Sequence, residues 1–276
     1  MEARLFLPKR RNIKVEFLEK ITSNPYKDLY WNVPDDQKFG SAAVIGGNGQ
    51  NFRSVIKTAE YLTNSFPLKE VKTVLPDSLK SKLPPLDNFV FLKTTDMGSF
   101  CDVDEMKGVI DSSDFNLIVG DLSKNKVTGM ALSSAFLSSE KPLLITRDTI
   151  DLVAREKLEQ ILMRDNLTIF GSIMQWQKIF RGIYYPKVLQ PSQSLINVAE
   201  SFHKFTLSFP VQVLTLHDNQ ILIAKNGVVK VVPIEKSGYP AITVWNGELA
   251  SKIAAMNYYN PDKFIEATVA AIFKDN

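Results

Sequence analysis

Short apolar runs alternate with segments of helical spacing along most of the chain. The apolar runs predict buried strands at residues 41–47, 70–75, 88–92, 115–120, 142–146 and 167–170. The intervening segments predict helices at residues 52–66, 102–110, 127–137, 149–163 and 173–180, with a short helix after Pro76. Parallel strands need a crossover between them, so this alternation predicts an α/β fold: a mostly parallel central sheet with helices on both faces.

The pattern changes after residue 180. A helix at 192–205 precedes three strands at 211–216, 220–225 and 228–234, and Asn226-Gly227 is a strong hairpin signal between the last two. A late antiparallel meander is therefore expected, followed by helices at 247–258 and 261–273. Because no linker rich in Gly, Ser or Pro divides the chain, we expect residues 41–276 to form one α/β domain. Residues 1–40 are expected to be an N-terminal extension that packs on the core, with a short amphipathic piece near residues 15–21.

Composition narrows the classes of protein that the chain can represent. Its 45% hydrophobic and 23% charged residues are typical of a folded globular protein. The net charge is only +3, and the one basic cluster, at residues 9–14, is interpreted as a solvated segment, so no nucleic-acid partner is expected. No apolar stretch reaches the roughly 18–20 residues that a bilayer requires, so we expect no membrane partner and a cytoplasmic location.

Cysteine and histidine are too scarce for several kinds of chemistry. A single cysteine excludes a disulfide within the chain, and two histidines leave little for a metal centre, so no metal ligand is assigned. We expect His203 to be packed or half-exposed in an amphipathic helix, and His217 to be exposed in a hairpin turn.

Candidate binding residues follow the first strand. Ligands of open α/β sheets collect at the carboxyl ends of the parallel strands. Gly46, Gly47, Asn48 and Gly49 come directly after that strand, and glycine lets a backbone approach a ligand closely. The segment could form the wall of a phosphate or nucleotide site, or a turn that needs glycine for its geometry alone. It matches neither a Walker loop nor a GxGxxG fingerprint.

Two acids follow later strands. Asp121 could hold a magnesium ion or a ribose hydroxyl, or it could be an ordinary loop acid. Asp148 is a second candidate for binding substrate, and the alternative is that it caps the helix that starts at residue 149.

The segment that leads into the penultimate predicted helix is the most specific candidate for an anion-binding site. The N-terminus of a helix presents unpaired N–H groups and a partial positive charge. Asn246 and Gly247 stand at this point, and the small residues Ala250 and Ser251 would let a phosphate come close. Glu248 lies in the first turn, where its carboxylate could act as a base. Alternatively, Asn246 caps an ordinary helix.

These segments, taken in order, resemble the ribokinase-like superfamily. The resemblance covers about residues 30–275 and rests on the runs AAVIGG, FNLIVGDL, PLLITRDTIDLV, LTIFGSIMQWQKIF, VQVLTLHDNQILIAKNGVVKVVP and NGELASKIAAM. Within the superfamily, the chain is most similar to the ADP/ATP-dependent NAD(P)H-hydrate dehydratases, the family also known as the YjeF C-terminal or carbohydrate-kinase-related family.

The resemblance implies a function and a set of ligands. ATP or ADP would donate a phosphoryl group to the hydroxyl of the hydrated nicotinamide, and elimination would restore NAD(P)H. Glu248 would be the catalytic carboxylate. The phosphate would be held by Asn246, Gly247, Ala250 and Ser251. The loop at residues 46–49, with Asp121 and Asp148, would bind the substrate. The family also implies Mg²⁺ as a candidate cation and a homo-oligomer.

The chain departs from the family pattern at two motifs. The family's His-Pro-Gly-Glu is replaced by residues 172–175, which read Ser-Ile-Met-Gln, and its Gly-Thr-Gly-Asp by residues 245–248, which read Trp-Asn-Gly-Glu. Aligned on glycine, Glu248 replaces the catalytic aspartate; aligned on the following Leu-Ala pair, Gly247 does, and no acid remains. Two hypotheses follow: a dehydratase or related small-molecule kinase of reduced activity, or a catalytically degenerate protein that binds a nucleotide or a protein partner.

Overall fold

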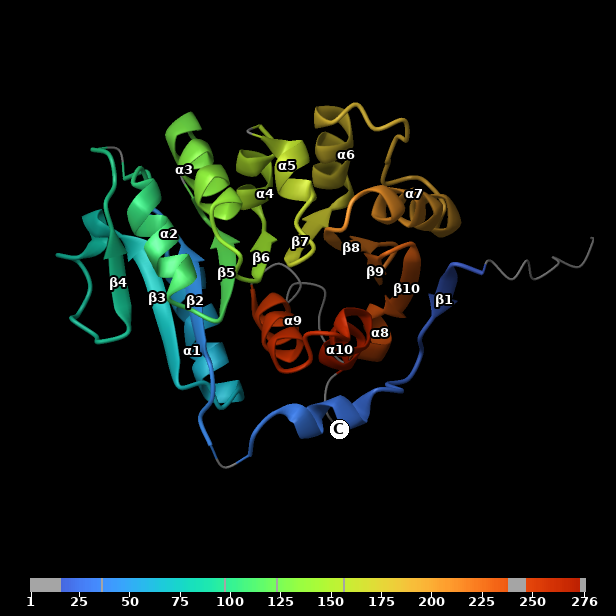
Figure 1. The fold of residues 1–276 in the computed structure, drawn as a ribbon, viewed down its shortest axis with the longest axis horizontal. Helices are drawn as coiled ribbons and strands as arrows, with labels where there is room; N and C mark the ends of the chain where they lie inside the picture. The colour runs from blue at the N-terminus through green and yellow to red at the C-terminus, as the bar shows by residue number, and fades with distance from the viewer. Residues whose placement is uncertain are drawn as a thin grey trace, which may run out of the picture.

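A ten-stranded sheet forms the centre of the molecule (Figure 1). The computed structural model describes residues 16–35, 37–96, 98–122, 124–155, 157–237 and 247–273. The strands are β1 (Leu18–Lys20), β2 (Ser41–Gly46), β3 (Glu70–Pro76), β4 (Phe89–Leu92), β5 (Phe115–Gly120), β6 (Leu143–Thr146), β7 (Leu167–Ser172), β8 (Gln212–His217), β9 (Gln220–Lys225) and β10 (Val228–Pro233). Their order is β1-β10-β9-β8-β7-β6-β5-β2-β3-β4, and of these strands only β9 pairs antiparallel with its neighbours, β8 and β10. The predicted α/β class, with its late antiparallel meander, is confirmed.

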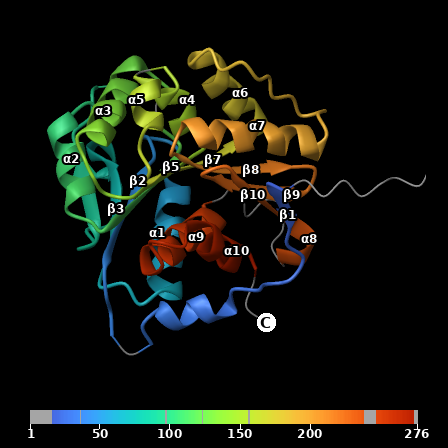
Figure 2. The ribbon, with the colours of Figure 1, turned by 45° about the vertical axis from the view of Figure 1, so that its right-hand side comes forward.

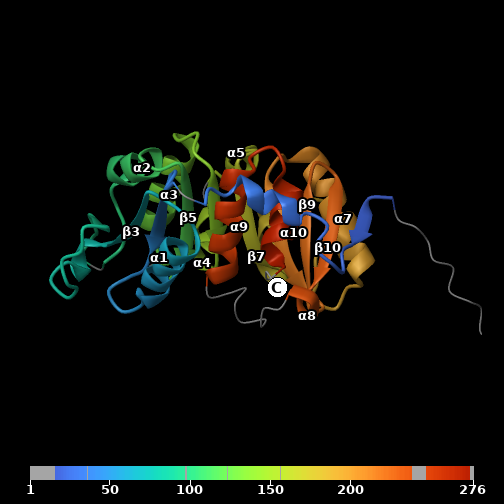
Figure 3. The ribbon, with the colours of Figure 1, turned by 90° about the horizontal axis from the view of Figure 1, so that it is seen from below.

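Helices cover both faces of this sheet (Figures 1 and 2). One face carries α2 (Val103–Asp111), α3 (Lys126–Leu137), α4 (Asp148–Val153), α5 (Leu158–Leu162), α6 (Ile173–Gly182) and α7 (Leu195–Ser208). The other carries α1 (Arg53–Ser65), α9 (Glu248–Tyr259) and α10 (Phe264–Ile272), which lie side by side in Figure 3. The short elements are α8 (Ile234–Ser237) and the 3₁₀ turns η1 (Lys27–Asn32) and η2 (Asp77–Leu79). The described residues include no helix with the length and apolarity that a membrane crossing requires.

The central strands are apolar because both of their faces are covered. Val44 and Leu117 are completely buried against the α1, α9 and α10 face, and Ile45 and Ile118 against the opposite face. Strands buried in this way are continuous apolar runs rather than alternating ones, which is why the sequence predicted them well.

Two local expectations are wrong. The helix expected at residues 149–163 is two helices, α4 and α5, separated at Lys157, which has a left-handed φ of 50°. In a continuous helix, Lys157 would follow the buried Val153 by one turn and would face the core. Because the helix breaks before Leu158, the apolar Leu158 faces the core instead. His217 is the last residue of β8 and only 4% exposed, because its ring Nε2 lies 2.8 Å from the Gln193 carbonyl oxygen.

The described part of the N-terminal segment adds a strand to the sheet. β1 pairs in parallel with β10, with Leu18 opposite Val229, and the Ile21 amide donates to the Val231 carbonyl over 2.8 Å. The η1 turn packs on α10, where the Tyr30 hydroxyl donates to the Ala270 carbonyl over 3.2 Å. A three-residue strand is too short to give a period-two signal, so the sequence suggested only an amphipathic piece here.

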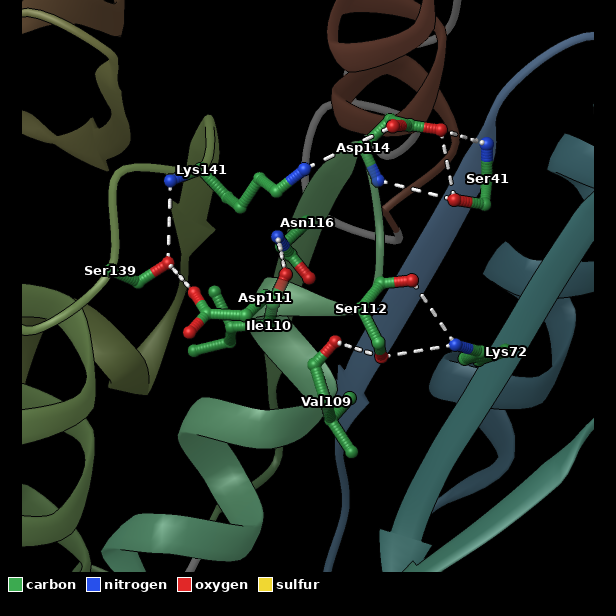
Figure 4. Close-up of polar contacts among 10 residues, drawn as sticks. All are labelled: Ser41, Lys72, Val109, Ile110, Asp111, Ser112, Asp114, Asn116, Ser139 and Lys141. Carbon is green, nitrogen blue, oxygen red and sulfur yellow. Dashed lines mark hydrogen bonds and ion pairs between the residues drawn. The ribbon is translucent and has the colours of Figure 1, made fainter.

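A polar network ties together the amino-terminal edge of the sheet (Figure 4). Asp114 accepts hydrogen bonds from the Ser41 amide and hydroxyl over 2.8 and 2.9 Å, and the Lys141 ammonium lies 4.0 Å from its other oxygen. Beside them, Ser139 donates to Asp111. A cavity of about 590 Å³ also opens at this edge, near Asp114 and Lys225, but none of the described residues that were predicted to form the site lines it. The described residues of the predicted site lie at the opposite edge of the sheet.

Candidate functional site

The sheet has a topological switch point between β2 and β5. From β2 the chain proceeds outward through β3 and β4, and it then returns to β5 and proceeds the other way through β6 and β7. Ligands of open α/β sheets bind in the crevice that this reversal leaves at the carboxyl ends of the strands. A cavity of about 580 Å³ lies there, lined by Asn48, Asn51, Asp121, Leu122, Lys124, Arg147, Asp148, Asp151 and Gln175. Three of the residues predicted from sequence, Asn48, Asp121 and Asp148, thus meet in one cavity.

The loop after β2 is fixed across the switch point by two hydrogen bonds. The Gly47 amide donates to the Gly120 carbonyl over 3.0 Å, and the Asn48 side-chain amide donates to the Asp121 carbonyl over 2.7 Å. The Asn48 side-chain oxygen accepts from the amides of residues 50 and 51, which closes the loop. Gly46 ends β2, while Gly49 lies farther round the loop, near Ser78. Asn48 therefore orders the loop and also lines the cavity.

Asp121 forms a two-pronged ion pair with Arg147. Arg147 Nη1 lies 2.9 Å from Asp121 Oδ2, Nη2 binds Oδ1, and the Ser54 hydroxyl of α1 also donates to Oδ2. Such bidentate pairs fix geometry as well as charge. Both residues hold left-handed backbone conformations, with φ of 58° and 56°, and strain of this kind concentrates at functional sites. Since Arg147 and Ser54 already occupy its carboxylate, Asp121 is a poor ligand for Mg²⁺ in this arrangement.

Asp148 lies against the backbone of Gly120. A Cβ atom on Gly120, whose φ is 85°, would lie 2.3 Å from Asp148 Oδ1. That oxygen is buried and accepts no hydrogen bond within the described residues. Burial raises the pKa of Asp148, and the charge of neighbouring Asp121 raises it further. The capping alternative is wrong, because Asp148 is the first residue of α4, the N-cap is Arg147, and no described side chain caps this helix.

The segment that departs from the family pattern supports this cavity. Ser172 and Gln175 form a capping box at the start of α6. The Gln175 side-chain amide also donates to the Arg147 carbonyl over 2.5 Å and to Asp151 Oδ2 over 3.2 Å. Gln175 thereby holds the strained backbone of Arg147 in place from the neighbouring helix.

The N-terminus of α9 lies at the same edge of the sheet, against α1. Gly247 is its N-cap, with φ of 94°, and a Cβ there would lie 2.4 Å from the Thr58 hydroxyl and 3.3 Å from a methyl group of Val119 in β5. Ala250 and Ser251 are completely buried, and the Ser251 hydroxyl donates to the Glu248 carbonyl over 2.7 Å. Asn246 lies outside the described residues.

Glu248 lines a second cavity, of about 510 Å³. The other described residues that line it all come from α1: Arg53, Ser54, Lys57, Thr58 and Tyr61. Ser54 links the two cavities, because its hydroxyl binds Asp121 in the first cavity. The predicted catalytic acid and the predicted substrate-binding acids therefore belong to adjacent but different cavities.

Three residues of the site, Arg147, Gln175 and Ser54, were assigned no binding role from the sequence. Arg147 follows β6 directly and Gln175 lies in the first turn after β7, so the rule that ligands collect at strand ends could have identified both. Ser54 lies within a helix, and only the packing of α1 brings its hydroxyl to Asp121.

Comparison with known proteins identifies the fold as ribokinase-like. A ribokinase-like superfamily protein from Enterococcus faecalis matches with a TM-score of 0.66 and 18% identity, over 95% of this chain and 87% of that one. A hypothetical protein from Streptococcus mutans matches with a TM-score of 0.63 and 17% identity, over 90% and 86% of the two chains. A Bacillus subtilis pyridoxal kinase, solved as an ADP complex, matches with a TM-score of 0.52 and 10% identity, over 85% and 89%. No family model matches the chain, and no curated protein matches it significantly.

Proposed function

We propose that this protein transfers a phosphoryl group from a nucleotide to a hydroxyl of a small molecule. The observation that carries the proposal is the crevice at the switch point, where Asn48, Asp121, Arg147 and Asp148 converge. The fold is shared with a pyridoxal kinase seen with ADP, which supports a nucleotide as the second ligand. More specifically, we propose the ADP/ATP-dependent dehydration of NAD(P)H hydrate, because the ordered motifs of the chain resemble that family.

The proposed reaction has two steps. The substrate hydroxyl oxygen bonds to the terminal phosphorus while the bridging P–O bond breaks, so ATP leaves as ADP, or ADP as AMP, and a base takes the hydroxyl proton. The C–O bond of the new phosphate ester then breaks, inorganic phosphate leaves with the bond electrons, and the neighbouring ring carbon gives up a proton to water, which restores the double bond. In this scheme Asp148 and the loop at residues 46–49 bind the substrate, Glu248 is the base, and the α9 N-terminus stabilises phosphate charge.

The described residues could hold Mg²⁺ only together with the phosphates of a bound nucleotide. Among the described residues, no group of three Asp, Glu, His or Cys side chains is placed to hold a metal ion. Mg²⁺ is commonly bound by one or two carboxylates together with phosphate oxygens and water, so a nucleotide would bring most of its ligands.

A nucleotide-binding protein without turnover is the second candidate. The specific observation in its favour is that Glu248 lines the cavity beside α1, whereas Asp121 and Asp148 line the cavity at the switch point. Glutamate is also one methylene longer than the family's aspartate, and a misplacement of about 1 Å can reduce the rate roughly 100-fold.

Incubation with hydrated NADH and either ATP or ADP, with NADH absorbance as the readout, tests the proposal. We expect turnover by the unmodified chain, with a loss of about 100-fold or more in Glu248→Gln. Glu159→Gln, which removes an exposed acid of α5, is the matched control and should retain activity. No turnover at high protein concentration, with retained nucleotide binding, would favour the second candidate. Turnover that survives Glu248→Gln would show that another group is the base.

A further inference from the structure

The cavity of about 590 Å³ at the amino-terminal edge of the sheet has no role in the proposed reaction. It lies where the first residues of β5 and β6 meet the last turns of α9. Phe115, Leu144 and Ala254 form an apolar wall and belong to the core beneath α9 and α10. Cavities of this size, with a few charged groups beside apolar walls, are typical of sites for small molecules.

Lys225, the last residue of β9, is a half-buried cation that lines this cavity. Its Nζ lies 5.4 Å from the centre of the Phe264 ring, and it forms no ion pair or hydrogen bond with a described residue. Burial lowers the pKa of Lys225, while the charges of Asp165 and Asp262 act in the opposite direction. Since a half-buried charge without a partner is costly, Lys225 is suited to an anionic group brought by a ligand.

Groups that favour a cation line the same cavity. Asp165 and Asp262 are exposed, and neither carboxylate has an ion-pair or hydrogen-bond partner among the described residues. The last turn of α9 adds the partial negative charge of a helix C-terminus. In that turn, Asn257 lines the cavity, and its buried Oδ1 accepts no hydrogen bond from a described residue. Unpaired acceptors of this kind suit the N–H groups of an ammonium.

The polypeptide around the cavity is held in place without a ligand. The Gln212 side-chain amide donates to the Asp165 carbonyl over 2.9 Å, and the Arg164 guanidinium donates to the Lys141 carbonyl over 2.8 Å. Asp114, the third acid that lines the cavity, already accepts hydrogen bonds from Ser41 and lies 4.0 Å from the Lys141 ammonium (Figure 4). The charged groups that stay available are therefore Lys225, Asp165 and Asp262.

We propose that this cavity binds a zwitterionic amino acid with a bulky apolar side chain. A simple anion would meet three acids and one cation among the described lining residues, and a simple cation would leave Lys225 without a partner. A ligand with both charges satisfies both signs: its carboxylate pairs with Lys225, and its ammonium lies toward Asp165, Asp262 and the end of α9. Its side chain packs on the apolar wall. This edge of the sheet is opposite the proposed nucleotide site, so the inference does not rest on the proposed function.

Calorimetric titration of the full chain with L-phenylalanine at pH 7 tests the inference. Two analogues each lack one of its charges: 2-phenylethylamine has no carboxylate, and 3-phenylpropionate has no ammonium. We expect L-phenylalanine to bind and each analogue to bind about 10-fold more weakly or worse, since loss of a charge-assisted contact commonly costs that much. Glycine, which keeps both charges but has no side chain, should also bind at least about 10-fold more weakly.

Matched variants locate the ligand in this cavity. Lys225→Met removes the charge but keeps an apolar chain beside Phe264, and should weaken L-phenylalanine by about 10-fold or more without weakening 2-phenylethylamine. Ligand-observed NMR measures the weaker analogue, and circular dichroism confirms that each variant is folded. Lys82→Met and Asp87→Asn change exposed charges that do not line the cavity, and should leave the affinity within about twofold.

Several results would overturn the inference. No binding of L-phenylalanine by the unmodified chain would do so, as would equal affinity for either singly charged analogue. An equal loss in the Lys82 and Lys225 variants, or displacement of L-phenylalanine by ATP in direct competition, would reject the location. The outcome is separable from the proposed reaction: amino-acid binding without turnover of hydrated NADH would retain this site alone, and turnover without amino-acid binding would retain the reaction alone.

Discussion

Gly120 shows most clearly how one residue shapes the crevice. Its φ is 85°, and a Cβ atom at this position would lie 2.3 Å from Asp148 Oδ1, so there is no room for a side chain. We predict that Gly120→Ala lowers the free energy of unfolding by about 2–3 kcal/mol, from backbone strain and displacement of Asp148. Urea unfolding measures the change.

The control for this substitution is a glycine without such constraints. Gly108 lies within α2, and no described atom lies within 4 Å of a Cβ added there. Gly108→Ala should be stabilising by about 0.5–1 kcal/mol, since alanine favours helix. Equal effects of the two substitutions would contradict the close approach of Asp148 to Gly120.

Asp148 should make stability depend on pH. Its pKa in the folded state is raised by burial and by Asp121, above the ordinary value of 3.8. Between pH 3.8 and the raised pKa of the folded state, the folded protein binds more protons than the unfolded protein. The free energy of unfolding therefore falls as pH rises through that window. Above this pH window Asp148 is ionised in both states, and the burial of its charge lowers the free energy of unfolding by a constant amount. We therefore predict that Asp148→Asn stabilises the protein at pH 7, with a gain that shrinks toward pH 4.

Thermal unfolding between pH 4 and 8 measures this difference. Asp87→Asn changes an exposed acid and serves as the reference. A difference between Asp148→Asn and the unmodified chain that stays constant across the range would argue against a buried carboxylate of raised pKa.

Part of the site could be predicted from the sequence because strand ends can be located from apolar runs. Asn48, Asp121 and Asp148 each follow such a run, and the sheet brings their positions together. Ser54 and Thr58 could not be found in this way, since their roles depend on how α1 packs against β5 and α9. The packing of α1 also explains why Glu248 lines a different cavity from Asp121 and Asp148, which the sequence could not show.

Among the elements, α6 links helix capping to the geometry of the crevice. The Ser172 hydroxyl caps its first turn, and Gln175 returns to Ser172 while holding the Arg147 carbonyl. We predict that Ser172→Ala costs about 1 kcal/mol of unfolding free energy and that Gln175→Ala costs more, because it also frees Arg147. Urea unfolding and ATP titration should be measured together.

A second capped helix provides the comparison. Ser194 caps α7 through the Asn197 amide and does not line the crevice. Ser194→Ala should cost a similar amount of stability and leave ATP affinity unchanged. If Ser194→Ala and Gln175→Ala weakened ATP binding equally, α6 would have no particular role in the site.

The elements also show where patterns fail. The parallel strands were predicted well because burial on both faces makes each a continuous apolar run. The break between α4 and α5 was missed because it depends on one lysine at an otherwise apolar stripe position. β1 was missed because three residues carry too little pattern.

At the scale of the whole molecule, the ribokinase-like fold places two cavities side by side at one edge of the sheet. Fold alone does not determine function, so we infer the nucleotide from the chemistry at that edge. The homo-oligomer and the cytoplasmic location stay predictions, and sedimentation measures the first of them. The boundary at residue 40, between the N-terminal extension and the α/β domain, also stays a prediction.

The most direct measurement is a crystal structure of the full chain with ATP or ADP. The account predicts density for phosphates at the start of α9, with the terminal phosphate toward Asp121 and Ser54. Density in the cavity at the amino-terminal edge instead, or none at either carboxyl-edge cavity at saturating nucleotide, would contradict it.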